Sequence, residues 1–276
     1  MLEWASEYFE NRQVPDPRHS IEWLLADVLG CKRLDLYLQY GRPLSPDELD
    51  RVRPLVKRRA GHEPLQYITG STNFMGCQLE VNQSVLIPRI ETEQLVELLL
   101  ESTPKLESNT IHLLDVGSGS GCIPIAVKKF RPAWSCMGID ISDEALALSQ
   151  KNAGANNLDV QFASGDLFKL DQIDKPEQGW DIIVSNPPYI MTGEKSSLEK
   201  QVTDYEPGLA LFHDDPLEVY RPILSYAHQE NAALFLELND QLADQILDMS
   251  TTFFSSPKIK HDLDNNPRFL IAGLSS

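Results

Sequence analysis

The stretch that decides the fold is "LLDVGSGSGCIPIAV", residues 113–127. Its apolar start is typical of a buried strand and its end of a short helix, with three glycines between them. Glycine allows a tight turn, and because it has no Cβ the backbone can come close to a ligand. Glycine turns also join strands to helices for packing alone, so the rest of the chain must decide what this one does.

Helices and strands alternate on both sides of this turn, from residue 91 to the end of the chain. Such alternation implies a doubly wound, mainly parallel sheet, and therefore an α/β fold. The predicted strands cover residues 111–117, 135–140, 158–166, 180–188, 231–239, 258–263 and 268–273. The predicted helices between them include residues 92–102, 122–130, 142–155 and 216–229.

The chain before residue 91 follows other patterns. Residues 2–60 have helical spacing: one helix stops at Gly30, and another starts with a capping Ser45. Alternation and β-rich residues then predict a hairpin with an Asn-Gln-Ser turn at residues 82–84. We therefore expect a helical domain (1–71), a β-hairpin linker (72–90) and a larger domain (91–276).

Composition describes an ordinary globular protein. The hydrophobic content is 42%, and no apolar run approaches the length of a membrane span. The acidic, amphipathic N-terminus is neither a secretory signal nor a transit peptide. The four cysteines lack paired spacing, which favours reduced thiols and a cytoplasmic location. The histidines are scattered, so no metal site is expected.

The net charge of −17 is unevenly distributed. Residues 1–75 hold ten Lys and Arg against eleven Asp and Glu, whereas the remainder holds fourteen against thirty. An acidic main domain disfavours a broad nucleic-acid surface. Within the near-neutral part, residues 51–59 concentrate five basic side chains. A solvated helix face is the simpler interpretation of this segment, and a docking patch for an acidic partner or RNA is the sharper one.

Three carboxylates follow the predicted strands: Asp115, Asp140 and Asp166. Open α/β sheets bind ligands at the carboxyl ends of their strands, and Asp140 has the spacing of a ribose-binding acid. Singly, each is typical of a turn or cap. Together with a GxGxG turn, in which Cys122 replaces the late glycine of a dinucleotide site, they favour a cationic, nucleotide-like ligand such as S-adenosylmethionine.

The run "WDIIVSNPPYI" ends a predicted strand in Asn186, Pro187, Pro188 and Tyr189. The Asn186 side-chain carbonyl and the Pro187 backbone carbonyl together accept two hydrogens from a planar –NH₂ group. Tyr189 offers a ring on which a flat amide or base stacks, and the prolines keep the acceptors rigid. A plain Pro-Pro turn, or a peptide ligand for a partner module, is the alternative.

The combination of "DVGSGSG", "GID", "GD" and "NPPY" resembles class I S-adenosylmethionine-dependent methyltransferases that modify planar nitrogens. With "EPLQYITG" (63–70), "LIPRIETE" (86–93) and "YEPGLALF" (205–212), nearly the whole chain resembles the release factor glutamine methyltransferases, the HemK/PrmC family. The resemblance implies a Rossmann-like, seven-stranded sheet. It also implies methylation of N(5) of the glutamine in the Gly-Gly-Gln motif of class-1 peptide chain release factors, by a monomer that binds neither membrane nor stable nucleic acid.

The resemblance also implies roles for single residues. Asn186, Pro187 and Tyr189 are the implied catalytic residues, with Asn186 also beside the cofactor. Pro188, Arg89 and Glu93 complete the implied substrate site, and the helical domain is implied to dock the release factor. The implied cofactor residues are Gly117, Ser118, Gly119, Ser120, Gly121, Asp140, Asp166 and Leu167.

Three residues depart from the family pattern: Ile90 replaces a usual proline, Leu167 an aromatic ring, and Asn239 a glycine. The alternatives within methyltransferases are an enzyme acting on a ribosomal-protein glutamine and an adenine-N(6) DNA enzyme. From other classes, a non-catalytic module that binds release factor and a nicotinamide dehydrogenase were weighed. The intact glycine turn and NPPY disfavour the first of these, and the GxGxG spacing disfavours the second.

Overall fold

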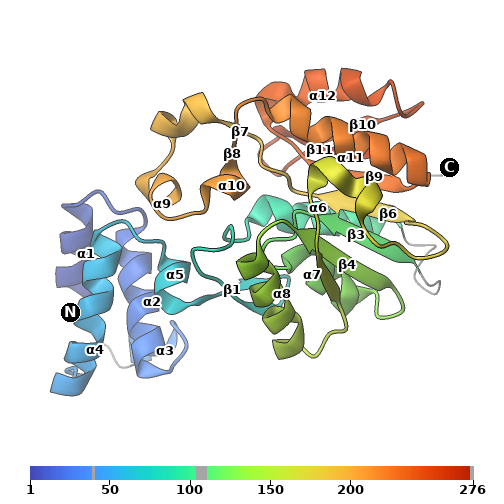
Figure 1. Cartoon of the computed structure of the whole chain (residues 1–276). Helices are drawn as coiled ribbons and strands as arrows, with labels where there is room; N and C mark the ends of the chain where they lie inside the picture. The colour runs from blue at the N-terminus through green and yellow to red at the C-terminus, as the bar shows by residue number, and fades with distance from the viewer. Residues whose placement is uncertain (39–40, 104–110, 274–276) are drawn as a thin grey trace. The chain divides into compact units, whose positions relative to one another are not determined.

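The computed structural model describes residues 1–38, 41–103 and 111–273. The chain forms two compact units (Figure 1). The first comprises Met1–Ser71 and Leu198–Tyr205, and the second comprises Thr72–Ser197 and Glu206–Ser276. Residues 274–276, which end the predicted large domain, lie outside the described residues.

The first unit is helical. Ser45 forms a capping box with Glu48, and Gly30 ends its helix in the left-handed conformation at φ 63°, as the sequence predicts. A buried cluster centred on Phe9, Ile21 and Leu24 holds the helices together. The helices are α1 (Leu2–Glu10), α2 (Pro17–Leu29), α3 (Asp35–Leu38), α4 (Pro46–Ala60), α5 (Leu65–Thr69) and α9 (Lys200–Thr203).

The basic segment on α4 is not uniformly solvated, so the prediction of a solvated face is wrong at one residue. Arg51, Arg53, Lys57 and Arg58 are exposed, but Arg59 is only 3% exposed. Arg59 follows Val52 and Val56 on the inward stripe of the helix, and those two side chains are buried. Burial lowers the pKa of its guanidinium.

Residues 198–205 come from the middle of the chain, yet they belong to the helical unit. The Oε1 atom of Gln201 accepts a hydrogen bond from Arg59 Nη1 at 3.1 Å. The hydroxyl of Tyr205 donates to the Gly61 carbonyl at 2.7 Å. The prediction of a helical domain from residues 1–71 alone does not include this segment.

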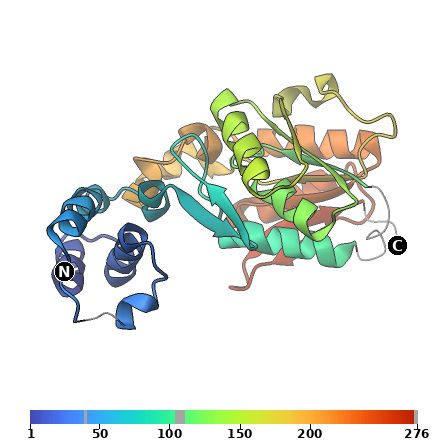
Figure 2. The same cartoon turned by 90° about the horizontal axis from the view of Figure 1, so that it is seen from below.

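The second unit begins with the predicted hairpin, whose two strands run side by side in Figure 2. They are β1 (Ser71–Phe74) and β2 (Cys77–Glu80). The predicted turn position is wrong. The chain reverses at Met75 and Gly76, where both residues have positive φ and Asn73 accepts from the Gly76 N–H. Asn82 instead accepts from Ser84 N–H beyond the hairpin.

A seven-stranded sheet forms the centre of the second unit, in the order β10-β11-β9-β6-β3-β4-β5. Six strands run in the same direction, five of them paired in parallel, and β11 runs antiparallel to both of its neighbours, β10 and β9. The predicted α/β class and seven strands are therefore confirmed. The strands are β3 (His112–Val116), β4 (Ser135–Asp140), β5 (Gln161–Ser164), β6 (Ile182–Ser185), β9 (Ala233–Glu237), β10 (Lys258–His261) and β11 (Pro267–Ala272).

Alternating side chains of the central strands fill two separate cores. Leu113 and Val184 face one core with helices α6 (Ile90–Ser102) and α7 (Cys122–Phe130). Leu114 and Ile183 face the other core with α11 (Pro216–Glu230) and α12 (Ala243–Ser250). This alternation is the period-2 geometry of strands covered on both faces. The other elements are α8 (Asp143–Ala155), α10 (Gly208–Leu211), η2 (Leu167–Gln172), η3 (Thr192–Ser197), η4 (Asp240–Leu242), β7 (Ile190–Met191) and β8 (Phe212–His213).

Candidate active site

The strand register brings the predicted site residues to one edge of the sheet. Val116 pairs with Ile139 and with Ser185, and Ser185 pairs with Leu236. The next residue of each strand therefore stands at the same level, at the carboxyl edge where open α/β sheets bind ligands. These four residues are Gly117, Asp140, Asn186 and Glu237.

The glycine turn has the conformation that glycine permits. Gly117, Gly119 and Gly121 have φ of 77°, 53° and 78°, a region that other residues rarely adopt. A Cβ on Gly121 would lie 2.9 Å from the Phe162 ring. The turn leads into the N-terminus of α7, whose free N–H groups suit polar ligand groups. Substitution of these glycines would change the shape of the loop.

Asp140 fixes this turn to the neighbouring strand. Its Oδ2 accepts from Gly119 N–H at 2.8 Å, and its Oδ1 accepts from Ser142 N–H at 2.9 Å. Each carboxylate oxygen has further lone pairs, so both remain able to accept from a ligand hydroxyl. Asp140 thus ties the glycine loop to the end of β4, and its carboxylate lies at the carboxyl edge of the sheet.

Polar side chains beneath the turn lack partners. Both carboxylate oxygens of Asp115 and the hydroxyls of Ser118 and Ser120 are buried without a hydrogen-bond partner among the described residues. Burial raises the pKa of Asp115 to about 7; the nearby Ser118 hydroxyl opposes this rise, and the charge of Asp140 adds to it. Buried unsatisfied groups cost free energy, and in native proteins they concentrate where a ligand completes the bonding.

Asp166 lies beyond the end of β5. Its Oδ1 accepts from Phe168 N–H at 2.9 Å, and its Oδ2 pairs with Lys169 at 3.1 Å. The hydrogen bond from the Phe168 N–H is the main cause that lowers the pKa of Asp166. Leu167 packs against the second core, while the Phe168 ring is half exposed. An aromatic side chain thus stands one position after the leucine.

Asn186 follows β6, and within the described part of the chain only the nitrogen of its side-chain amide is hydrogen-bonded. Its Nδ2 donates to Thr92 Oγ1 at 3.0 Å. Its Oδ1 has no hydrogen-bond partner among the described residues. Pro187 is buried, and the Ser185 hydroxyl donates to the Val116 carbonyl at 2.6 Å, which fixes the end of the strand. The geometry leaves the carbonyl oxygen of Asn186 available as an acceptor.

Tyr189 is anchored at both ends. Its hydroxyl donates to Glu237 Oε1 at 3.0 Å, and its carbonyl accepts from Asn239 Nδ2 at 3.0 Å. Burial raises the pKa of this hydroxyl well above its ordinary value. Asn239, the departure at a usual glycine, thus supplies a side chain that ties down the end of the NPPY corner. A glycine has no side chain with which to make this bond.

Two site residues are missing from the predicted set: Thr92 and Glu237. Glu237 ends β9, is 1% exposed, and accepts from Thr92 Oγ1 at 2.8 Å. Burial raises the pKa of Glu237 to about 7, against the lowering effect of the Thr92 and Tyr189 hydroxyls. The signal that could have found Glu237 is a carboxylate at the end of an otherwise apolar strand, the pattern that singles out Asp115 and Asp140.

Arg89 and Glu93 have partners within the second unit. Arg89 pairs with the buried Glu206 at 2.5 Å. Glu93 accepts from Met75 N–H at 2.7 Å and so holds the turn of the hairpin. Between them on α6, Thr92 is the residue that reaches Asn186. Ile90, the departure from proline, is 64% exposed.

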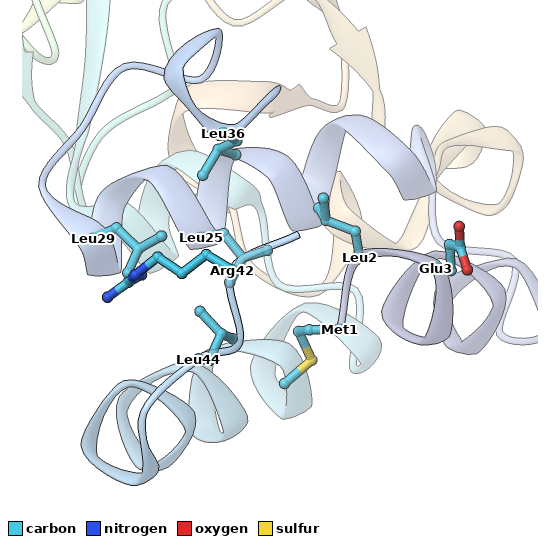
Figure 3. A pocket seen from close by; sticks show the side chains of 8 residues that line it. All are labelled: Met1, Leu2, Glu3, Leu25, Leu29, Leu36, Arg42 and Leu44. Carbon is cyan, nitrogen blue, oxygen red and sulfur yellow. The ribbon is translucent and has the colours of Figure 1, made fainter. Parts of the chain in front are cut away.

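A pocket of about 270 Å³ lies elsewhere, in the helical unit (Figure 3). Its lining is mainly aliphatic, and the Arg42 side chain at its edge pairs with Glu48. No group of three or more metal-binding side chains occurs in the described part of the chain. Within those same residues, no helix has the length and apolarity that crossing a membrane requires.

Comparisons with known proteins agree with this geometry. The family description "PrmC N-terminal domain" matches residues 1–70, and "Methyltransferase small domain" matches residues 91–203. The release factor glutamine methyltransferase of Geobacter sulfurreducens is 40% identical over 90% of this chain and 86% of that protein. Its counterpart in Leptospira interrogans is 36% identical over 98% of this chain and 96% of that protein.

Among solved structures, the catalytic domain of human METTL16 with an RNA hairpin has a TM-score of 0.54 at 13% identity. That similarity covers 83% of this chain and 82% of that one. At this identity the likeness concerns the fold. The fold and the carboxyl-edge site define a class I methyltransferase, the class that takes its methyl group from S-adenosylmethionine. Within that class, the chain belongs to the release factor glutamine methyltransferase family.

Proposed function

We propose that this enzyme methylates the side-chain amide nitrogen N(5) of the glutamine in the Gly-Gly-Gln motif of class-1 peptide chain release factors. The observation that carries the proposal is the state of Asn186. Its Nδ2 is already bonded to Thr92, and its Oδ1 has no partner among the described residues. An oriented, unpaired carbonyl suits a substrate that offers hydrogens, as the –NH₂ of glutamine does.

The side chains at the carboxyl edge fit S-adenosylmethionine, which supplies an electrophilic methyl group bound to a sulfonium sulfur. The backbone at Gly117 and Gly119 leaves room for close approach, and Asp140 retains lone pairs for ribose hydroxyls. We assign Asp166 and Leu167 to the border of the adenine. In its ionised form, the buried Asp115 adds negative potential, which suits a cationic ligand.

We assign the orientation of the substrate to the NPPY corner. Asn186 Oδ1 and the Pro187 carbonyl accept the two amide hydrogens, and this aligns the nitrogen lone pair with the methyl carbon. The N–C bond forms as the S–C bond breaks, the sulfur becomes a neutral thioether, and one amide proton leaves to water. Acceptors fixed in advance stabilise the positive charge that develops on nitrogen, and alignment lowers the entropic cost.

We further propose that the protein acts as a cytoplasmic monomer and that its helical domain, residues 1–71, docks the release factor. The 72–90 linker joins it to the 91–276 methyltransferase domain. Arg89 and Glu93 close the substrate site from the linker side. The names of the similar proteins support release factor as partner. The acidic charge after residue 75 supports a protein substrate over DNA.

Labelled S-adenosylmethionine and purified release factors test the proposal directly. We expect label on the release factor, and mass spectrometry of its peptides should place one methyl group on the Gly-Gly-Gln glutamine. Ribosomal proteins and duplex DNA serve as parallel substrates in the same assay. Label on an adenine, or on a ribosomal-protein glutamine in preference to release factor, would replace this function with one of the alternatives.

A further inference from the structure

Asn186 is useful only if its amide stands the right way round. The two ends of a side-chain amide have the same shape, but one accepts hydrogen bonds and the other donates them. If the amide turned over, Nδ2 would face the substrate nitrogen and the acceptor would be lost. Some neighbouring group must therefore fix the orientation, and the contacts of Asn186 show which one.

Thr92 fixes the orientation of the Asn186 amide because its hydroxyl has a single hydrogen to donate. This hydroxyl donates to Glu237 Oε2 at 2.8 Å, so only its lone pairs remain for Asn186. Asn186 can then present only a donor to Thr92, which is the Nδ2 contact at 3.0 Å. The opposite amide orientation would place two acceptors against each other.

Glu237 is the group that sets the direction of this chain of hydrogen bonds. Its second oxygen accepts from the Tyr189 hydroxyl at 3.0 Å, so in its ionised form Glu237 accepts through both carboxylate oxygens. Its backbone carbonyl accepts from Tyr220 at 3.3 Å. Thr92 is 2% exposed and Glu237 1% exposed, so water does not compete for these bonds.

We propose that Thr92 and Glu237 are positioning residues for methyl transfer. They orient the Asn186 amide and the Tyr189 ring, so that the carbonyl of Asn186 faces the substrate nitrogen. The proposal rests on the function proposed above and extends it by assigning a role to two buried residues. They act through Asn186 and Tyr189, and they do not touch the reacting atoms.

The decisive variant is Thr92→Val, which keeps the shape of the side chain and removes the hydroxyl. We expect kcat to fall on the order of 10- to 100-fold, because the amide is free to turn over. The KM for release factor and the calorimetric Kd for S-adenosylmethionine should stay within about twofold, because these contacts lie elsewhere. Thr92→Ser restores the hydroxyl and should recover most of kcat.

Thr103→Val is the matched control. Thr103 is a buried threonine at the opposite end of α6, and its hydroxyl donates to the Leu99 carbonyl at 2.8 Å. This variant loses a buried hydroxyl as well, so its thermal unfolding should resemble that of Thr92→Val, yet kcat should be unchanged. If Thr92→Val keeps the wild-type kcat, or if Thr92→Ser is as slow as Thr92→Val, the positioning role is wrong.

A readout independent of activity separates this proposal from the proposed function. Hydrogen exchange of the Asn186 side-chain NH₂, followed by NMR, should be faster in Thr92→Val than in wild type and unchanged in Thr103→Val. If wild type fails to methylate release factor while this difference is present, the proposed function is wrong and the orienting contact stands. If exchange is the same in all three proteins, the orienting contact is wrong.

Discussion

The two units bury charge in different ways. The helical unit buries a cation, Arg59, and gives its guanidinium four hydrogen bonds. The acceptors are Ser20, Gln201, and the carbonyls of Glu63 and Pro15. No carboxylate in the described part of the chain lies within ion-pair distance of it. Each of its three guanidinium nitrogens therefore donates inside the protein.

The methyltransferase unit buries anions at the carboxyl edge of its sheet and leaves part of their bonding capacity unused. Asp115 has no hydrogen-bond partner among the described residues, and Asn186 keeps one free acceptor. A buried polar group that is fully satisfied serves the fold, whereas one that is left unsatisfied costs stability and is retained for a ligand. Substitution of a buried polar residue should therefore lower stability in the helical unit and lower activity in the methyltransferase unit.

The largest effect is expected from Asn186→Ala. Loss of one preorganised group that stabilises developing charge should lower kcat on the order of 1,000-fold, about 4 kcal/mol. The free energy of unfolding should fall by only about 1 kcal/mol, because the one bond lost from the fold is that of Nδ2 to Thr92. Initial rates with labelled cofactor measure the first quantity, and urea unfolding measures the second.

Cofactor affinity is the control for this variant. Isothermal titration should give a Kd for S-adenosylmethionine close to that of wild type. A variant that no longer binds cofactor would make Asn186 a cofactor residue rather than a substrate residue. That outcome would also mean that the free acceptor of Asn186 is not kept for the substrate.

Arg59→Met should lower stability and leave the methyltransferase site intact. The variant leaves the Glu63 carbonyl and the side-chain oxygens of Ser20 and Gln201 without this donor, while the Pro15 carbonyl keeps the Ser20 hydroxyl. This should cost about 3 kcal/mol of unfolding free energy. Amide hydrogen exchange should rise in residues 198–205, because Gln201 loses its contact with α4. Cofactor affinity, measured well below the melting temperature, should be unchanged.

Arg53→Met is the matched control on the same helix. Arg53 is exposed and, among the residues that the structure describes, bonds only to the exposed Asp50, so the loss should be within about 0.5 kcal/mol. Equal stability losses in the two variants would show that the buried bonds of Arg59 contribute nothing special. The helical unit would then gain no stability from its buried charge, and the proposed difference between the two units would be wrong.

These contrasts also show what sequence reasoning could reach. Local signals were sufficient for Ser45 and Gly30, because a cap or a left-handed turn depends on a few neighbouring residues. Strand order was sufficient for Asp140 and Asn186, because parallel strands end at one edge. The burial of Arg59 had a signal that was not used, since it continues the apolar stripe of Val52 and Val56.

Other features had no local signal. Thr92 and Glu237 lie 145 positions apart, and their contact depends on α6 covering the face of β9 from which Glu237 projects. Residues 198–205 join the helical unit through Gln201 and Tyr205, which have no distinguishing pattern in the chain. Both features are products of tertiary packing, which spacing along one sequence does not encode.

The smallest of the three effects is expected from Asp115→Asn, and it depends on pH. Burial raises the pKa of Asp115 to about 7 in the folded state, from an ordinary value near 3.8. A raised carboxyl pKa means that the folded protein holds its proton more tightly than the unfolded chain does. Wild type should therefore lose stability as pH rises from about 4 to about 7, and gain it back on acidification within that window.

An asparagine cannot lose a proton, so the variant should lack this part of the pH dependence. At pH 8, without cofactor, we expect Asp115→Asn to be more stable than wild type, and the difference, which this pKa shift limits to about 4 kcal/mol, should vanish near pH 4. If Asp115→Asn follows the wild-type curve, the buried carboxylate is satisfied after all. The methyltransferase unit would then resemble the helical one, in which buried charge serves only the fold.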